Sequence, residues 1–213
     1  MFIIWGWRAV MEVLGLGLFH CPTCQQDREY RHVRPRRWFT LFFVPVIPLQ
    51  RLEPFVECTT CKGTYREAVL EIPTTEQLEH QLGLATRAAL AHVVASAGST
   101  PRATEEAIRR IGAAPGVGTY DEARLLVDIA AFTDRATAQR YVATAARHLS
   151  PAGREDFARR LLGLAEAWGP DGAPVTDPPI DALAAALELS PAHLAGIRQH
   201  ASTGSTGSTD GAA

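Results

Sequence analysis

The four cysteines of this chain form two C-x-x-C pairs, Cys21 and Cys24 in "CPTC" and Cys58 and Cys61 in "CTTC". A C-x-x-C pair makes a tight turn that can aim two thiolates at one ion. Two such pairs supply the ligands of a tetrahedral zinc site with Zn–S distances of about 2.3 Å. Because four thiolates fill the coordination shell, the predicted single zinc ion is structural rather than catalytic.

Two other chemistries also use cysteine pairs. Two structural disulfides would suit a secreted protein, but we find no export signal. A redox-active C-x-x-C usually begins a helix beside a βαβ pattern, whereas "QQDREYRHV" after the first pair is typical of a turn and a strand. We favour the shared zinc ion, although the interval between the pairs is longer than usual. Gly63, just after the second pair, can adopt the positive φ that such a turn often requires.

The composition changes near Pro73. Residues 1–73 hold all four cysteines and three of the four tryptophans, whereas the remainder is rich in Ala and Leu. We therefore expect an α+β protein: a β-rich zinc ribbon over residues 1–73, an all-α domain of about seven helices over 74–200, and a disordered Gly/Ser/Thr tail over 201–213. The formal net charge of −2 gives no overall attraction to nucleic acid or membrane.

An apolar run, "RRWFTLFFVPVIPL", lies between the cysteine pairs. Its apolar part is shorter than the roughly 20 residues of a spanning helix, so we predict no transmembrane segment. As a strand, both faces of Trp38–Leu49 are apolar, and we expect it to be buried on two sides, by "FIIWGWRAV" or the helical domain. Phe42 is our test position for this burial. The alternative is contact with a partner or a membrane surface. We expect the prolines, Pro45 and Pro48, to end the strand.

Five arginines with interleaved aromatics precede and enter this run: Arg28, Arg31, Arg34, Arg36 and Arg37. A zinc ribbon with arginines and aromatic residues can bind nucleic acid. A zinc ion with four thiolates carries a charge of −2, however, so nearby arginines are also expected on electrostatic grounds. We favour a solvated hairpin and keep nucleic-acid binding as the alternative.

Nearly all of residues 1–70 resembles the small bacterial zinc-ribbon proteins. Their pattern is an apolar strand, C-P-x-C, R-R-W-F-T-L-F-F-x-P-x-I-P-L and then V-E-C-x-x-C-x-x-x-Y. The resemblance implies that Cys21, Cys24, Cys58 and Cys61 are zinc ligands, and it implies no catalytic activity. That family often has Gly directly after each cysteine pair, where this chain has Gln25 and Lys62.

The second part of the chain shows helical stripes and capping signals. Thr119 and Glu122 fit a capping box, and Ser150-Pro151 and Ser190-Pro191 fit an N-cap followed by proline. Two apolar stripes mark core-facing helices: Leu78, Leu82, Ala85, Ala89 and Val93, then Phe157, Leu161, Leu164 and Trp168.

Residues 76–198 resemble the TerB-like (tellurite-resistance-associated) helical domain, most clearly in "FARRLLGLAEAWGPDGAPVTDPPIDALAAALELSPAHLAGI". That family is associated with metal sensing and stress response, and its acidic loops are proposed metal contacts. Only Asp171 maps onto this pattern, because Ala97 stands where the first-half Asp is expected. We favour an ordinary turn at Asp171 and an N-cap at Asp177.

We find no acid/base pair, nucleophile constellation or phosphate loop. His20 and His92 are interpreted as a strand residue and a residue at the edge of the core. The expected function is a non-enzymatic, cytoplasmic bacterial protein that works with another protein in interaction or stress-linked scaffolding. The alternative is a nucleic-acid-binding ribbon with a helical regulatory domain.

Overall fold

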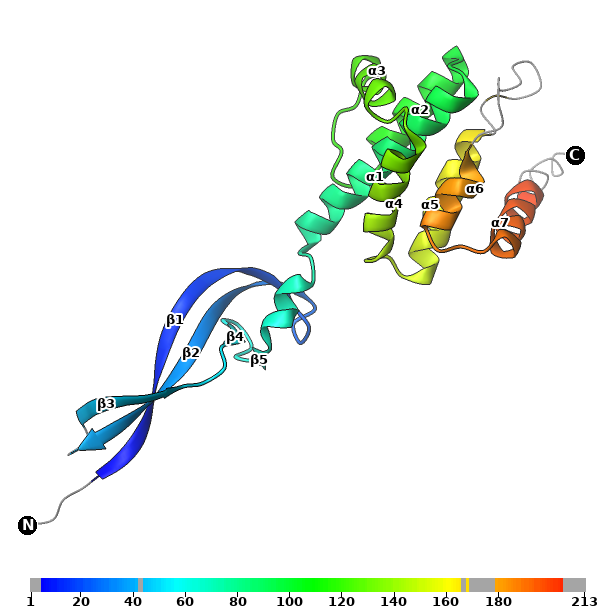
Figure 1. Cartoon of the computed structure of the whole chain (residues 1–213). Coiled ribbons are helices and arrows are strands. Elements are labelled where there is room, and N and C mark those ends of the chain that lie inside the picture. Colours follow the sequence, from blue (N-terminus) through cyan, green and yellow to red (C-terminus); the bar gives the residue numbers. More distant parts are fainter. Residues whose placement is uncertain (1–4, 42–43, 166–167, 169–178, 205–213) are drawn as a thin grey trace, which may run out of the picture. The chain divides into compact units, whose positions relative to one another are not determined.

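A computed structural model describes residues 5–41, 44–165, 168 and 179–204 (Figure 1). The chain is α+β, as predicted, with an N-terminal antiparallel sheet followed by seven helices in the described residues. It divides into two compact units, residues 1–77 and 78–213, and the boundary falls inside the first helix.

The central strand of the first unit is β2, and the other strands are arranged around it. β1 pairs antiparallel with β2 along almost its full length (Figure 1). On its other side, β2 pairs with β4 near the cysteines and with β3 at the opposite end. The strands are β1 (Trp5–Cys21), β2 (Gln26–Leu41), β3 (Val44–Arg51), β4 (Phe55–Cys58) and β5 (Thr64–Tyr65).

The structure corrects the prediction that prolines end the apolar strand. β2 ends at Leu41, and Pro45 and Pro48 both lie inside β3. Among the strands that the structure describes, β3 pairs only with β2, so it is an edge strand there. An edge strand tolerates proline because one of its sides needs no N–H donor for a neighbouring strand.

Within the first unit, the prediction of burial on two sides is also wrong for the part of this run that lies in β3, whereas Trp38 and Phe39 are half-buried and Thr40 is buried. Val44, Val46, Ile47 and Leu49 are 49–60% exposed. The reason is that "GWRAV" of β1 pairs beside β2 within the same sheet and does not cover its face, as in the pairing of Trp7 with Phe39. Phe42 lies outside the described residues.

The cysteine end of the sheet has a small core of its own. Phe19 and Val56 are fully buried there beside Cys21 and Cys58. The ring of Phe19 contacts two tyrosine rings, at centroid distances of 5.6 Å to Tyr30 and 5.9 Å to Tyr65. The 3₁₀ helix η1 (Glu67–Glu71) contributes Val69 and Leu70 to this core.

The second unit packs helices around an Ala- and Leu-rich core. The stripe of Phe157, Leu161, Leu164 and Trp168 is buried, as predicted. The helices are α1 (Thr75–Ala97), α2 (Pro101–Gly112), α3 (Glu122–Ala131), α4 (Arg135–Ala146), α5 (Pro151–Ala165), α6 (Ile180–Ala186) and α7 (Pro191–Gly204). α7 therefore extends through residues 201–204 of the segment expected to be a tail, and 205–213 lie outside the described residues.

The predicted caps hold at two helices and fail at a third. Ser150 and Ser190 accept hydrogen bonds from the N–H groups of Gly153 and His193, each at 3.2 Å. α3 is capped by Asp121, which accepts from Arg124 N–H, and not by Thr119. A carboxylate directly before the first helical residue is the better placed acceptor.

None of the described helices alone is long and apolar enough to cross a membrane. α6 and α7 reach that length and composition only together, as a pair bent by 117°. Their larger apolar side chains, including Ile180, Leu183 and Leu194, are buried in the core of the helical unit.

Candidate metal centre

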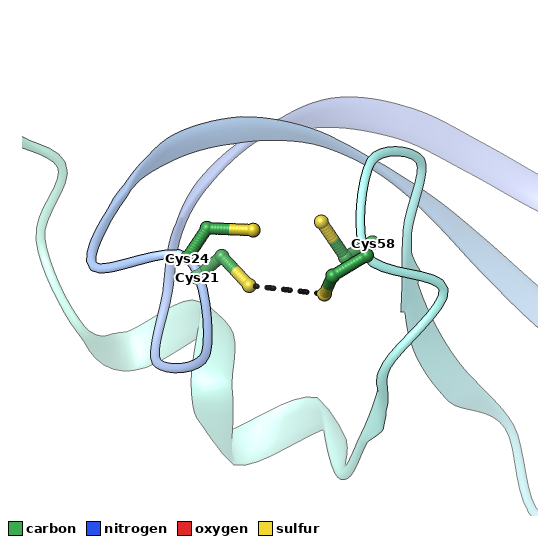
Figure 2. Close-up of side chains that lie close together, drawn as sticks. Cys21, Cys24 and Cys58 are labelled. Atoms are coloured by element: carbon green, nitrogen blue, oxygen red, sulfur yellow. Dashed lines mark hydrogen bonds between the residues drawn. The ribbon is translucent and has the colours of Figure 1, made fainter.

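The structure brings the four predicted cysteines together. Their Sγ atoms all lie within 4.8 Å of one another, although the two pairs are far apart in the sequence. Figure 2 shows Cys21 and Cys24 on one turn, with their sulfurs directed toward the turn that carries Cys58. The Sγ atoms of Cys21 and Cys61 are 3.7 Å apart, and all four cysteines are free thiols.

Two equivalent turns hold the cysteines. The first is closed by a hydrogen bond from Gln25 N–H to the Cys21 carbonyl at 2.8 Å, and the second by Lys62 N–H to the Cys58 carbonyl at 3.0 Å. Gln25 and Lys62 have left-handed backbones, with φ of 51° and 60°. These are the two positions where the resembling family often has Gly, which adopts this conformation without strain.

Gly63 serves a different purpose from the one predicted for it, because Lys62 supplies the positive φ of the second turn. A Cβ at Gly63 would lie 2.7 Å from Tyr65 Oη and 3.3 Å from Cys61 Sγ. The Gly63 N–H also donates to Cys61 Sγ at 3.4 Å. This position therefore needs a residue without a side chain for reasons of space.

Tyr65 is a site residue that the sequence reasoning did not single out. Its hydroxyl lies 3.4 Å from Cys21 Sγ and 2.6 Å from Thr23 Oγ1. The hydrogen bond to Cys21 raises the pKa of Tyr65 to about 12, so the phenol keeps its proton. The tyrosine in the pattern C-x-x-C-x-x-x-Y is the signal that could have identified it.

The surroundings affect the thiols unequally. Burial raises the pKa of Cys21, but hydrogen bonds from Tyr65 and from the N–H groups of Cys24 and Thr23 outweigh it and lower the pKa to about 6. Burial and the neighbouring sulfurs of Cys21 and Cys61 raise the pKa of Cys24 to about 12. Crowded thiols thus oppose one another's ionisation.

The arrangement fits a zinc ion. In a tetrahedron with Zn–S bonds of about 2.3 Å, neighbouring sulfurs are about 3.8 Å apart, close to the 3.7 Å between Cys21 and Cys61. A disulfide would need the sulfurs at about 2.05 Å. Four cysteines from two turns are also the donor set of structural zinc sites.

The metal-ligating cluster consists of the four cysteines, and the other candidate residues of this unit are not part of it. His20 is in β1 and its Nδ1 is 3.1 Å from Asp27 Oδ1, as expected for a strand residue. The five arginines of the basic segment all lie in β2. Arg36 and Trp38 form a cation–π pair, with the guanidinium 5.3 Å from the ring centre.

The helical unit contains a buried polar cluster that the sequence did not reveal. Asp128 of α3 is 2% exposed and accepts two hydrogen bonds from Arg87 of α1, at 2.7 and 2.8 Å. Tyr120 donates a third, at 2.6 Å. Burial and Asp128 raise the pKa of Tyr120, which keeps the donor proton in place. With both carboxylate oxygens engaged, this cluster ties α3 to α1.

Three further predicted positions, Asp171, Asp177 and His92, lie in the second part of the chain. Asp171 and Asp177 lie outside the described residues, so the turn and the N-cap stay predictions. His92 is 3% exposed, deeper than the core-edge position expected, and its Nδ1 lies 2.9 Å from the Phe132 carbonyl oxygen. This contact joins α1 to the end of α3.

Comparison with known proteins agrees with the cysteine geometry. No curated protein and no solved structure matches the chain. Residues 19–77, which include all four cysteines and Tyr65, match the model of a zinc-ribbon family.

Proposed function

We propose that the N-terminal unit binds one structural zinc ion through Cys21, Cys24, Cys58 and Cys61. The observation that carries this proposal is the convergence of four sulfurs within 4.8 Å from two matching turns. The zinc would join the first turn to the second and so hold β1 and β2 to β4. Because this end of the sheet has a small core, the metal supplies much of its folding free energy.

Cobalt substitution tests the coordination. Cobalt(II) bound by four thiolates in a tetrahedron has intense visible and thiolate charge-transfer absorption, and zinc should displace it from the same site. We expect one equivalent of cobalt to saturate the signal. A weak spectrum typical of octahedral oxygen ligation would contradict the four-cysteine assignment.

Replacing Tyr65 with Phe should weaken zinc binding without abolishing it. The change removes the hydroxyl that lies 3.4 Å from Cys21 Sγ and leaves the ring in the core. Partners of metal ligands are typically worth 10–100-fold in affinity, and we expect a loss of about tenfold in a chelator competition assay. Tyr30→Phe is the matched control, since Tyr30 packs on the same Phe19 ring. Equal affinities for the two variants would contradict the role of Tyr65.

For the whole chain we propose a non-enzymatic interaction or stress-response scaffold in which a TerB-like helical module follows the zinc ribbon. Two features support this reading. A zinc ion held by four thiolates is a folding element rather than a catalyst, and exposed apolar residues such as Val44 and Val46 offer a surface for another protein. Free thiols fit a reducing, cytoplasmic compartment. Affinity capture from the native host with the zinc-loaded chain would identify the partner.

Nucleic-acid binding is the second candidate function, and the arrangement of Arg34, Arg36 and Trp38 on one face of β2 is the observation that favours it. We expect binding to be weak or absent, because the Arg36 guanidinium already lies over the Trp38 ring on which a base would stack.

The measurement is a titration of single- and double-stranded oligonucleotides at several salt concentrations, with the Arg34→Ala/Arg36→Ala variant as the comparison. Submicromolar binding that falls steeply with salt and disappears in this variant would reverse the order of the two candidates.

A further inference from the structure

The outer edge of β1 is a long apolar strand with no neighbouring strand among the described residues. β1 pairs only with β2 among the described strands (Figure 1), so the main-chain N–H and C=O groups on its other edge have no strand partner there. Every residue from Trp7 to Leu14 is exposed. An exposed apolar edge of this length is a template for pairing with another strand.

One face of β1 carries an apolar stripe. Residues that lie opposite each other in an antiparallel pair share a face, and five large apolar residues of β1 lie opposite odd-numbered residues of β2. A bulge between Val13 and Gly15 keeps the stripe on one face past that point. The five, 45–72% exposed, are Trp7, Met11, Val13, Leu16 and Leu18.

The charged residues of β1 indicate which kind of partner this strand can pair with. Between Gly6 and Phe19, β1 has two charged residues, Arg8 and Glu12. They lie opposite Trp38 and Arg34 of β2 and therefore share the face opposite to the one that carries the apolar stripe. They are also equally distant from Val10, one on each side. An antiparallel copy of the same strand, related by a two-fold axis at Val10, would place Arg8 opposite Glu12 of the second copy, and Glu12 opposite its Arg8.

We propose that two copies of this chain pair through their β1 edges, antiparallel and centred on Val10. The pairing places Trp7 opposite Val13 and Ala9 opposite Met11, so the apolar stripe continues across both copies. Glu12 would lie between Arg34 of its own chain and Arg8 of the second. A two-fold interface uses the same surface twice, and this strand is complementary to itself in both charge and apolarity. An anionic lipid surface fits this strand less well, because it would repel the Glu12 carboxylate.

A cysteine placed on the axis tests the register in the zinc-loaded, full-length chain. Val10→Cys should form an intermolecular disulfide under mild oxidation, because the two copies of this position face each other. Leu16→Cys is the matched control: Leu16 is 72% exposed against 40% for Val10, yet its two copies would be about 40 Å apart along the strands. Cross-linking of Leu16→Cys but not Val10→Cys would overturn the proposal.

A charge exchange tests the pairing energy. Sedimentation equilibrium should show a dimer for the native chain, and Arg8→Glu or Glu12→Arg should raise the dimer dissociation constant roughly tenfold by placing like charges opposite each other. The double variant Arg8→Glu/Glu12→Arg should return the dimer dissociation constant to that of the native chain, because opposite charges again face each other. All variants should keep their zinc content and helical signal. A native chain that is monomeric at high micromolar concentration, or that binds anionic phosphatidylserine vesicles as a monomer through this strand, would overturn the proposal.

Discussion

Replacing Cys58 with Ser should unfold the first unit and leave the helical unit folded. The substitution removes one of four sulfurs from a site that also forms part of the small core, where Cys58 is fully buried. Structural zinc sites in small domains contribute apparent binding free energies of about 10–16 kcal/mol, more than a sheet of this size can replace from its few buried side chains. We therefore expect loss of zinc and loss of the near-ultraviolet signal of Tyr30 and Tyr65.

Thr60→Ser is the matched control, because Thr60 is exposed and lies between Cys58 and Cys61 in the same turn. The Thr60→Ser protein should bind one zinc per chain and be as stable as the native protein. Far-ultraviolet circular dichroism should show the helical signal of α1–α7 in both variants, since these helices have a separate core. A Cys58→Ser protein that retains stoichiometric zinc and a folded sheet would show that Cys58 is not a ligand.

Replacing Asp128 with Ala should give the second large effect, in the helical unit. The change leaves the Arg87 guanidinium and the Tyr120 hydroxyl without the acceptor that they share. Breaking a buried ion pair by removing one partner typically costs 3–5 kcal/mol. Because about a third of the Arg87 side chain stays exposed, we expect a decrease of about 3 kcal/mol in the free energy of unfolding, at the lower end of that range.

Urea denaturation followed by the helical signal measures this decrease. Glu122→Ala removes the same charge from an exposed position on the same helix and should cost less than about 1 kcal/mol. Asp128→Asn keeps the shape of the side chain and some of its hydrogen bonds. Its decrease in the free energy of unfolding should therefore lie between those of Asp128→Ala and Glu122→Ala. If Asp128→Ala were no more destabilising than Glu122→Ala, the cluster would not be the tie between α1 and α3 that its geometry indicates.

The cysteine cluster could be predicted because its information is local. A C-x-x-C spacing fixes a turn by itself, and two such turns need only one strand pairing to bring them together. Details within the turn were less predictable: the left-handed residue is Lys62, while Gly63 is required by the approach of Tyr65. That approach depends on the pairing of β5 with β4, which the spacing C-x-x-C-x-x-x-Y marks with its tyrosine but does not by itself specify.

The apolar run shows why burial is harder to read from sequence. An apolar pattern on both faces of Trp38–Leu49 indicates that both faces of the strand could be buried. It does not indicate whether another layer of secondary structure packs on either face. In the first unit β1 joins the same sheet edge to edge, so Ile47 and Leu49 stay about half exposed. The Arg87–Asp128 pair was missed for a related reason, because it joins two helices that are distant in sequence and its partners follow no periodic pattern.

Metal content is the most direct test of the central claim. Elemental analysis of the chain, purified under reducing conditions and without added metal, should find about one zinc per chain. After a denaturing wash with chelator, all four cysteines should react as free thiols. A protein that contains no metal and holds Cys21, Cys24, Cys58 and Cys61 in two intact disulfides would contradict the assignment of this site to zinc.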